Sequence, residues 1–352
     1  MIPRRVAYVV STFPKISETF IAGELAALLE EGVDVRVLSL TRPEDSLAHD
    51  IVRTSGMIER TTYGAHSFAA VLAAFEPDLV HAHFATDPTA TARTLAAGRG
   101  VPFTFTAHGY DVYRRPPADF AARAAAASGV VTVSDANRRY IRETFGVPTD
   151  LIHVIPCGVD TDFFTPGDGC AEPPLIVCVA RLRDVKQLDV LLRACALVRQ
   201  RGVTFRCAIV GEGPERPALE ALRARLGLED VVEMPGAAEQ NDIRAWWQRA
   251  SIATLSSRSE GMPVSLMEAA ACGVPAVAPA VGGIAELIDD GVTGRVTRPH
   301  DAHALAEGLI ELLVDAPLRT RMRIAARARA ERHFSRAHQI SRLLQLWSAI
   351  LN

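Results

Sequence analysis

Residues 252–268 read Ile252-Ala253-Thr254-Leu255-Ser256-Ser257-Arg258-Ser259-Glu260-Gly261-Met262-Pro263-Val264-Ser265-Leu266-Met267-Glu268. The first six residues predict a buried strand, and the apolar, alanine-rich stretch after Pro263 predicts a helix that ends at Gly273. Pro263 suits the first turn of this helix, because the N–H that proline lacks would be unpaired there. Glu260 is therefore expected in a loop between a strand and a helix.

The same alternation of strand and helix continues along the whole chain. Its strand-like runs are continuously apolar, which predicts parallel sheets covered on both faces. We therefore predict an α/β protein with two Rossmann-like, doubly wound domains. The predicted strands are Arg5–Ser11, Val33–Leu40, Leu79–Phe84, Phe103–His108, Val130–Ser134, Ile152–Pro156, Leu175–Ala180, Phe205–Gly211, Val231–Gly236, Ile252–Ser257, Ala276–Pro279 and Gly294–Thr297.

The length of 352 residues exceeds the size at which a single core stops growing, and a hydrophobic content of 49% can fill two cores. A segment rich in proline and glycine separates the two halves and is interpreted as a linker. A ligand is expected in the cleft between them. The predicted divisions are an N-terminal domain over 1–160, the linker over 161–174, a C-terminal domain over 175–330, and a helix over 331–352 that could return to the first domain.

Composition excludes several classes of protein. A net charge of −3 provides no broad cationic field, so nucleic acid is not an expected partner. No apolar run approaches the roughly 20 residues of a spanning helix, and the first residues lead directly into a strand, so we expect a cytoplasmic protein. The arginine-rich tail from about Leu318 is interpreted as a solvated helix face, with contact to the anionic inner membrane surface as the alternative. The six cysteines show no Cys-x-x-Cys spacing and are interpreted as reduced, packed thiols.

Two carboxylates, Glu260 and Glu268, flank the start of the predicted helix. Glutamates at such positions are usually solvated surface residues. Here the loop follows the carboxyl end of a strand, where α/β sheets bind ligands, and the apolar helix implies burial. Fixed carboxylates bind hydroxyl groups, whereas a helix start favours a diphosphate. The combination predicts a nucleotide-sugar site.

Two further features of the second half fit such a site. Arg181 and Lys186 follow a predicted strand and could neutralise a diphosphate, although a surface pair is the alternative interpretation. Lys186 is also one of only two lysines in the chain. The pair Gly282-Gly283 would let backbone N–H groups approach a ligand closely.

In the first half, His108 ends the fourth predicted strand and is expected to face the cleft. A neutral imidazole there could hydrogen-bond a sugar hydroxyl, and a structural histidine is an equal alternative. His81 and His83 share one face of a strand, but with no third ligand apparent we expect a packed pair rather than a metal site. Ser17 is a candidate N-cap, and Lys15 is expected to be free to meet an anion.

Together these residues resemble glycosyltransferase family 4, the retaining nucleotide-sugar transferases of GT-B fold. The resemblance covers essentially the whole chain, and Pro156-Cys157-Gly158-Val159-Asp160 also fits the family pattern. The opening Phe-Pro-x-x-Ser-Glu-Thr-Phe and the stretch His81-Ala82-His83-Phe84 are similar to members that assemble exopolysaccharides such as colanic acid.

The resemblance implies a role for each matching position. It implies that Arg181 and Lys186 hold the donor diphosphate, that Glu268 binds the ribose, and that His108 contacts the sugar. It also implies transfer without a divalent metal or other cofactor, from a UDP- or GDP-sugar to a glycan, lipid-linked or small-molecule acceptor. The donor sugar would lie on Glu260 with the backbone of Gly261, Met262 and Pro263, and the base near Gly236 and Ala237.

The acceptor side departs from the family pattern, because Phe13-Pro14-Lys15 stands where many relatives carry a glycine pair. Lys15, Ser17 and Asp160 are its candidate residues.

Two other functions use the same architecture. A nucleotide-sugar 2-epimerase would need further acid and base groups and no acceptor. A non-catalytic nucleotide-sugar sensor would not require Glu260, Arg181 and Lys186 to be intact.

Overall fold

The computed structural model describes residues 2–15, 18–43, 50–167 and 171–352. The chain divides into two compact units. Unit 1 comprises Met1–Gly158 and Arg336–Asn352, and unit 2 comprises Val159–Ser335. Each unit contains one parallel sheet, of seven strands in unit 1 and six strands in unit 2. The predicted pair of doubly wound α/β folds is therefore confirmed.

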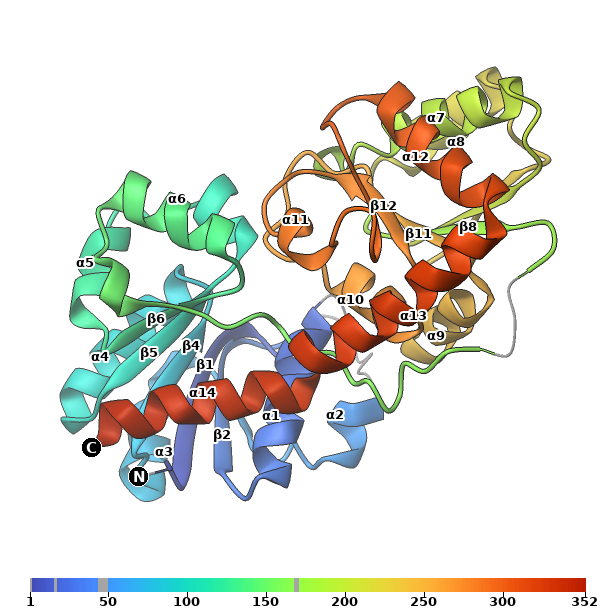
Figure 1. The fold of residues 1–352 in the computed structure, drawn as a ribbon. Helices are drawn as coiled ribbons and strands as arrows, with labels where there is room; N and C mark the ends of the chain where they lie inside the picture. The colour runs from blue at the N-terminus through green and yellow to red at the C-terminus, as the bar shows by residue number, and fades with distance from the viewer. Residues whose placement is uncertain (1, 16–17, 44–49, 168–170) are drawn as a thin grey trace. The chain divides into compact units, whose positions relative to one another are not determined.

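The sheet of unit 1 has the strand order β3-β2-β1-β4-β5-β6-β7. Figure 1 labels its strands β2, β1, β4, β5 and β6. Its strands are β1 (Arg5–Thr12), β2 (Asp34–Thr41), β3 (Thr61–Tyr63), β4 (Leu79–His83), β5 (Phe103–Ala107), β6 (Gly129–Thr132) and β7 (Ile152–Val154). Its helices are α1 (Thr19–Glu30), α2 (Asp50–Thr54), α3 (Phe68–Phe75), α4 (Asp87–Arg99), α5 (Phe120–Ala126), α6 (Asp135–Phe145) and α14 (Arg336–Leu351), with short turns η2 (Ala65–Ser67), η3 (Tyr110–Arg114) and η4 (Thr149–Leu151).

Strand β1 shows how the sheet of unit 1 is buried on both faces. Val6, Tyr8 and Val10 pack into a core shared with helices α1 and α14, whereas Ala7 and Val9 face the core under α3, α4, α5 and α6. This explains why the strand is continuously apolar. Helix α14 lies beside α1 on the first of these faces (Figure 1). The end of the chain thus completes the core of unit 1.

The sheet of unit 2 has the order β10-β9-β8-β11-β12-β13. Helix α7 packs against α8 and α12, and α10 packs against α9 and α13. The strands are β8 (Leu175–Val179), β9 (Arg206–Val210), β10 (Val232–Gly236), β11 (Ile252–Thr254), β12 (Ala276–Pro279) and β13 (Gly294–Thr297). The helices are η5 (Asp184–Lys186), α7 (Leu188–Gln200), α8 (Arg216–Arg225), α9 (Gln240–Arg249), α10 (Val264–Ala271), α11 (Ile284–Leu287), α12 (Ala302–Val314) and α13 (Ala316–His333).

In both sheets the strand order reverses next to the first strand, between β1 and β4 in unit 1 and between β8 and β11 in unit 2. Ligands of doubly wound folds bind beyond the carboxyl ends of the strands at such a reversal. The strand β3 was not predicted, so His108 follows the fifth strand rather than the fourth. The three residues of β3 form the edge of the sheet and lack the apolar run that marks the other strands.

Several arginines of α13 have structural partners within unit 2. Arg327 donates to the carbonyls of Thr161, Phe164 and Ala271, so part of the segment interpreted as a linker is tied to this helix. Arg319, Arg323 and Arg329 likewise donate to backbone carbonyls. Much of the arginine density of the tail therefore serves packing. Over the described ranges, no helix combines the length and apolarity needed to cross a membrane.

Candidate functional site

In unit 2, Lys186 and Glu260 form an ion pair at the point where the strand order reverses. Lys186 ends η5, which follows β8, and Glu260 lies in the loop after β11. Lys186 Nζ lies 2.5 Å from Glu260 Oε1, and the two side chains are only 18% and 10% exposed. The sequence therefore correctly predicted that both residues lie at strand ends, and the structure brings them into contact.

The two loops that carry this pair are hydrogen-bonded to each other. Ser256 Oγ donates to the carbonyls of Lys186 and Gln187, at 3.0 and 2.8 Å. The N–H of Arg258 donates to the carbonyl of Val185, and its guanidinium pairs with Asp184 at 2.6 Å. The turn after β8 and the loop after β11 therefore form one braced structure.

Glycines bring two more loops against this structure. Gly282 has a φ of +52°, and a Cβ on it would lie 1.7 Å from the carbonyl oxygen of Glu260. Its neighbour Gly283 donates to the carbonyl of Gly261 at 2.8 Å. Gly211, which follows β9, also packs on the carbonyl of Ala180, because a Cβ on it would lie 2.0 Å from that oxygen. Only glycine permits such approaches, so the loops after β8, β9, β11 and β12 converge.

The start of α10 offers unpaired backbone donors beside Glu260. Within the described residues, the N–H groups of Gly261, Met262, Val264 and Ser265 make no hydrogen bond. Pro263 precedes the helix instead of lying in its first turn, because its ψ of 111° is extended. Free N–H groups at a helix start are suited to an anion or to a hydroxyl oxygen.

Glu268 is a buried carboxyl group in α10, with 7% of its surface exposed. Burial raises its pKa to about 8, and the nearby indole of Trp247 lowers it only in part. The indole Nε1 does not reach normal hydrogen-bond geometry with the described residues, so the carboxyl keeps its capacity to accept bonds. The carboxyl group of Glu268 is thus mostly neutral at pH values below about 8.

The remaining predicted residues of unit 2 lie at the same edge of the sheet. Arg181 follows β8, is exposed, and makes no ion pair with any residue that the structure describes. Gly236 ends β10, and its carbonyl accepts from Gly211 at 2.7 Å, which places it beside the β9 loop. Ala237 follows and is exposed. The structure shows no direct contact of Arg181 or Glu268 with the Lys186–Glu260 pair.

In unit 1, His108 follows β5 and is buried, with 8% of its surface exposed. Its backbone N–H donates to Asp111 Oδ1 at 2.9 Å, and its Nε2 lies 3.1 Å from His83 Nδ1. Burial, together with charge on His83, holds the pKa of His108 well below its ordinary value. This shift favours the neutral imidazole, the form that could hydrogen-bond a sugar hydroxyl.

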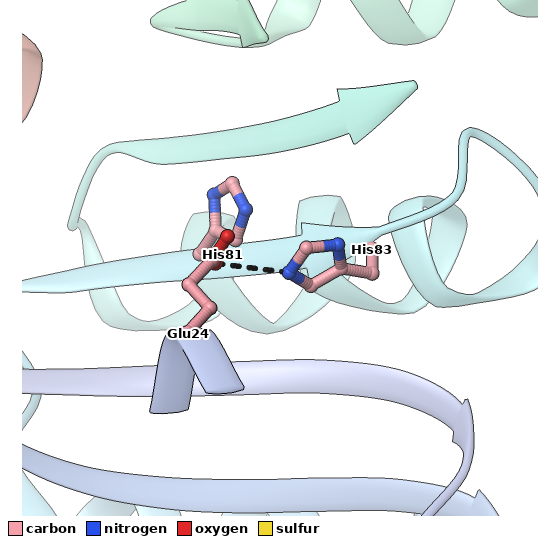
Figure 2. Close-up of side chains that lie close together, drawn as sticks. All are labelled: Glu24, His81 and His83. Carbon is pink, nitrogen blue, oxygen red and sulfur yellow. Dashed lines mark hydrogen bonds and ion pairs between the residues drawn. The ribbon is translucent and has the colours of Figure 1, made fainter. Parts of the chain in front are cut away.

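His81 and His83 form a cluster with a third group that the sequence did not suggest. Figure 2 shows Glu24 reaching from α1 toward His83, and single ligand atoms of Glu24, His81 and His83 lie within 4.8 Å of one another. Glu24 is thus a third candidate ligand, which was not apparent in the sequence. All four ring nitrogens are nevertheless hydrogen-bonded, His81 to Thr104 and Thr106 and His83 to Glu24 and His108. The cluster is a hydrogen-bonded network.

The candidate acceptor residues show a mixed outcome. Lys15 pairs with Glu18 at 2.5 Å, so the expectation that it is free was wrong. Asp160 Oδ1 accepts from the N–H groups of Asp162 and Phe163, which closes a turn. Ser17 lies outside the described residues.

Residues 17–163 match the family model for Glycosyltransferase Family 4, and residues 169–329 match the model for Glycosyl transferases group 1. A D-inositol 3-phosphate glycosyltransferase of Xylanimonas cellulosilytica is 32% identical over 72% of this chain and 68% of its own length. The chain belongs to glycosyltransferase family 4. It is a glycosyltransferase, and the epimerase alternative is not favoured.

Other relatives of this glycosyltransferase point to polysaccharides. A protein of Escherichia coli provisionally named as the colanic acid biosynthesis glycosyltransferase WcaL is 29% identical over 87% of this chain and 89% of its own length. Among solved structures, a glycosyltransferase of Rickettsia africae has a TM-score of 0.83 at 21% identity, covering 99% and 98% of the two chains. HepE of Anabaena, solved with UDP-glucose, has a TM-score of 0.77 at 18% identity, covering 99% and 100%. The structural likenesses support the GT-B fold.

Sequence reasoning missed several residues of the glycosyltransferase that the structure ties to the predicted ones. Glu24 could have been predicted from the sequence, because it is a charged residue on an apolar, buried helix. The same feature marks Glu268. Ser256 and Arg258 have no such feature, because their role is to bond a turn about 70 residues away.

Proposed function

We propose that this glycosyltransferase moves a hexosyl group from a nucleotide-diphosphate sugar to a hydroxyl of a glycan or lipid-linked acceptor, with retention of anomeric configuration, in the assembly of an exopolysaccharide. The contact between Lys186 and Glu260, at the convergence of four strand-end loops, is the observation that carries this proposal. A cation suited to phosphate lies there beside a carboxylate suited to sugar hydroxyls, which supports the proposal.

In the proposed complex, Lys186 and the exposed Arg181 bind the diphosphate of the donor. The free N–H groups of Gly261 and Met262 bind the donor sugar together with Glu260, and the start of α10 adds its favourable dipole. Because Lys186 forms an ion pair with Glu260, an incoming diphosphate would compete for this ammonium group. Glu260 then becomes available to the hydroxyl groups of the sugar.

Glu268 is proposed to bind the ribose. A vicinal diol donates two hydrogen bonds, and a buried carboxyl without a charged partner is a suitable acceptor. Such bonds favour the ionised form, so nucleotide binding should lower the pKa of Glu268 from about 8. The base would lie near Gly236 and Ala237, beside the β9 loop.

The proposed chemistry requires no divalent metal, because the cations and the helix start can stabilise the leaving diphosphate. His108 is proposed to contact the transferring sugar, as the family resemblance implies.

Since HepE was solved with UDP-glucose, a UDP-sugar is the first donor to test and a GDP-sugar the second. The name of WcaL supports an exopolysaccharide acceptor. Contact with a membrane surface stays a prediction.

A donor panel tests this proposal. The protein is incubated with UDP- and GDP-hexoses, with and without EDTA, and with lipid-linked and free glycan acceptors, and products are followed by proton NMR. We expect transfer that survives EDTA and yields a product with the anomeric configuration of the donor. An epimerised donor sugar without acceptor consumption would identify an epimerase, and an inverted linkage would refute retention.

A further inference from the structure

Arg216 connects three segments at one edge of unit 2. It begins α8, directly after the β9 loop (residues 211–215). Its Nη2 donates to the carbonyl of Gly211 and its Nη1 to the carbonyl of Met234 in β10, both at 3.2 Å. The guanidinium also pairs with Glu212 and with Glu220 of its own helix. One side chain, only 21% exposed, therefore holds the β9 loop, β10 and α8 together.

The contact between Arg216 and Glu212 is two-pronged. Arg216 Nε lies 2.9 Å from Glu212 Oε2, and Arg216 Nη2 lies 2.8 Å from Glu212 Oε1. A planar guanidinium that meets a carboxylate through two contacts fixes the orientation of both groups, which a lysine ammonium cannot do. Because half of the Glu212 side chain is exposed, this pair matters for geometry more than for stability.

The strand β10 changes its pairing where Arg216 binds it. Between Glu233 and Gly236 the register of β10 against β9 shifts by one residue, which is a β-bulge. A bulge re-aims the residues that follow it, and bulges occur often beside functional sites. The Met234 carbonyl that accepts from Arg216 lies within this bulge. The guanidinium therefore supports the part of the strand that leads into Gly236 and Ala237.

Gly236 lies against the same ion pair. Its φ is +99°, and a Cβ on it would lie 3.2 Å from Glu212 Oε1 and 3.9 Å from Arg216 Nη2. Its carbonyl accepts from the N–H of Gly211 in the β9 loop at 2.7 Å. The pair of Glu212 and Arg216 thus borders the end of β10, the position proposed for the base.

The β9 loop also contacts the turn that carries Arg181. The N–H of Leu182 donates to the carbonyl of Glu212 at 2.8 Å, and the N–H of Glu215 donates to the carbonyl of Leu182 at 3.1 Å. Gly213 permits this approach, because a Cβ on it would lie 2.2 Å from the Leu182 carbonyl oxygen. Since Leu182 directly follows Arg181, the loop joins the residue proposed to bind the diphosphate to the strand end proposed for the base.

We infer that Arg216 is a positioning residue that sets which nucleotide base the donor site accepts, by holding the bulged end of β10 at a fixed place relative to the Arg181 turn. This inference rests on the proposed function, in which Arg181 binds the diphosphate and the base lies near Gly236 and Ala237. Bases differ in the donors and acceptors on their edges. Backbone groups at the end of β10 can distinguish them only while these groups are held in place relative to the diphosphate.

Arg216→Lys tests the inference, because lysine keeps the charge but lacks the planar fork. Calorimetry on the intact protein measures the affinities for UDP, GDP, ADP and pyrophosphate, which lacks a base. We expect wild type to prefer one nucleotide. In Arg216→Lys this preference should fall by about tenfold or more, whereas the affinity for pyrophosphate should change by less than about threefold.

Arg223→Lys is the matched control. Arg223 lies on the same helix and donates to the carbonyl of Val232 at 3.1 Å, so it ties α8 to the opposite end of β10. Its substitution should leave the base preference unchanged. Glu212→Gln is a second test at a half-exposed position, where folding is not at risk. It weakens the same two-pronged contact and should lower the preference in the same direction as Arg216→Lys.

Four results would overturn the inference alone. They are equal binding of the three nucleotides by wild type, a wild-type preference in both Arg216→Lys and Glu212→Gln, an equal loss of preference in Arg223→Lys, and a loss of pyrophosphate affinity in Arg216→Lys as large as that of the preferred nucleotide. Failure of wild-type protein to bind any nucleotide or pyrophosphate would instead remove the proposed function, and the inference with it.

Discussion

Lys186 Nζ and Glu260 Oε1 lie 2.5 Å apart, although 74 positions separate the two residues in the chain. The contact joins the loops after β8 and β11, the two strands between which the sheet order of unit 2 reverses. A cation suited to phosphate and a carboxylate suited to sugar hydroxyls therefore lie at the position where doubly wound folds bind ligands.

Glu260→Gln should separate binding from turnover. The substitution removes the charge that pairs with Lys186, so the nucleoside diphosphate should bind at least as tightly as it does to wild type. We expect kcat to fall by about 10- to 100-fold because the donor sugar loses its carboxylate contact. Calorimetry and initial rates measure the two effects. Exposed Glu229→Gln is the control, and unchanged kcat in Glu260→Gln would exclude Glu260 from the site.

Gly282→Ala should disrupt the site through a backbone clash. A Cβ there would lie 1.7 Å from the carbonyl oxygen of Glu260, and the loop after β11 would have to move. Gly227→Ala is a matched control, because Gly227 has a similar φ of +63° with no atom within 4 Å of the added carbon. We expect much lower turnover for Gly282→Ala than for Gly227→Ala. Equal turnover by the two variants would mean that the close approach of Gly282 to the Glu260 carbonyl is not needed for transfer.

Glu268 should make the stability of the protein depend on pH. Between its ordinary pKa of 4.5 and its folded value of about 8, the native state holds a proton that the unfolded state has lost. The group therefore contributes stability at low pH that is lost as pH rises through this window. Glu268→Gln does not titrate, so its unfolding free energy relative to wild type should rise from pH 5 to pH 8, by at most about 1.4 kcal/mol per unit. Urea titrations at pH 5 and pH 8 measure the unfolding free energies of both proteins. If the difference between Glu268→Gln and wild type were the same at both pH values, the pKa of Glu268 would not be raised.

Arg327 should be a major contributor to the stability of unit 2. It donates to three carbonyls and pairs with Glu331. Arg327→Ala leaves these carbonyls without their donor and should lower the free energy of unfolding by about 2 kcal/mol or more. The exposed Arg321→Ala on the same helix should change it by less than about 0.5 kcal/mol. Similar losses in both variants would contradict this role.

Much of the fold was predictable because a buried parallel strand can be recognised in the sequence as a continuous apolar run. The edge strand β3 has no such run, since Thr61–Tyr63 is short and only partly buried. For the site, strand-end positions predicted Lys186 and Glu260, but not their contact. The bond between His83 and Glu24 spans 59 positions, and the close approach of Gly282 to Glu260 depends on the folded backbone. Such contacts arise only from tertiary packing, which local patterns do not record.

Binding of UDP and GDP to the intact protein, measured by calorimetry for wild type, Lys186→Ala and the exposed control Arg225→Ala, tests the central claim most directly. We predict that wild type and Arg225→Ala bind at least one of the two nucleotides with equal affinity, and that Lys186→Ala binds it at least about tenfold more weakly because one charge-assisted phosphate contact is lost. Equal affinity of Lys186→Ala and wild type, or no binding of either nucleotide to wild type, would contradict the account.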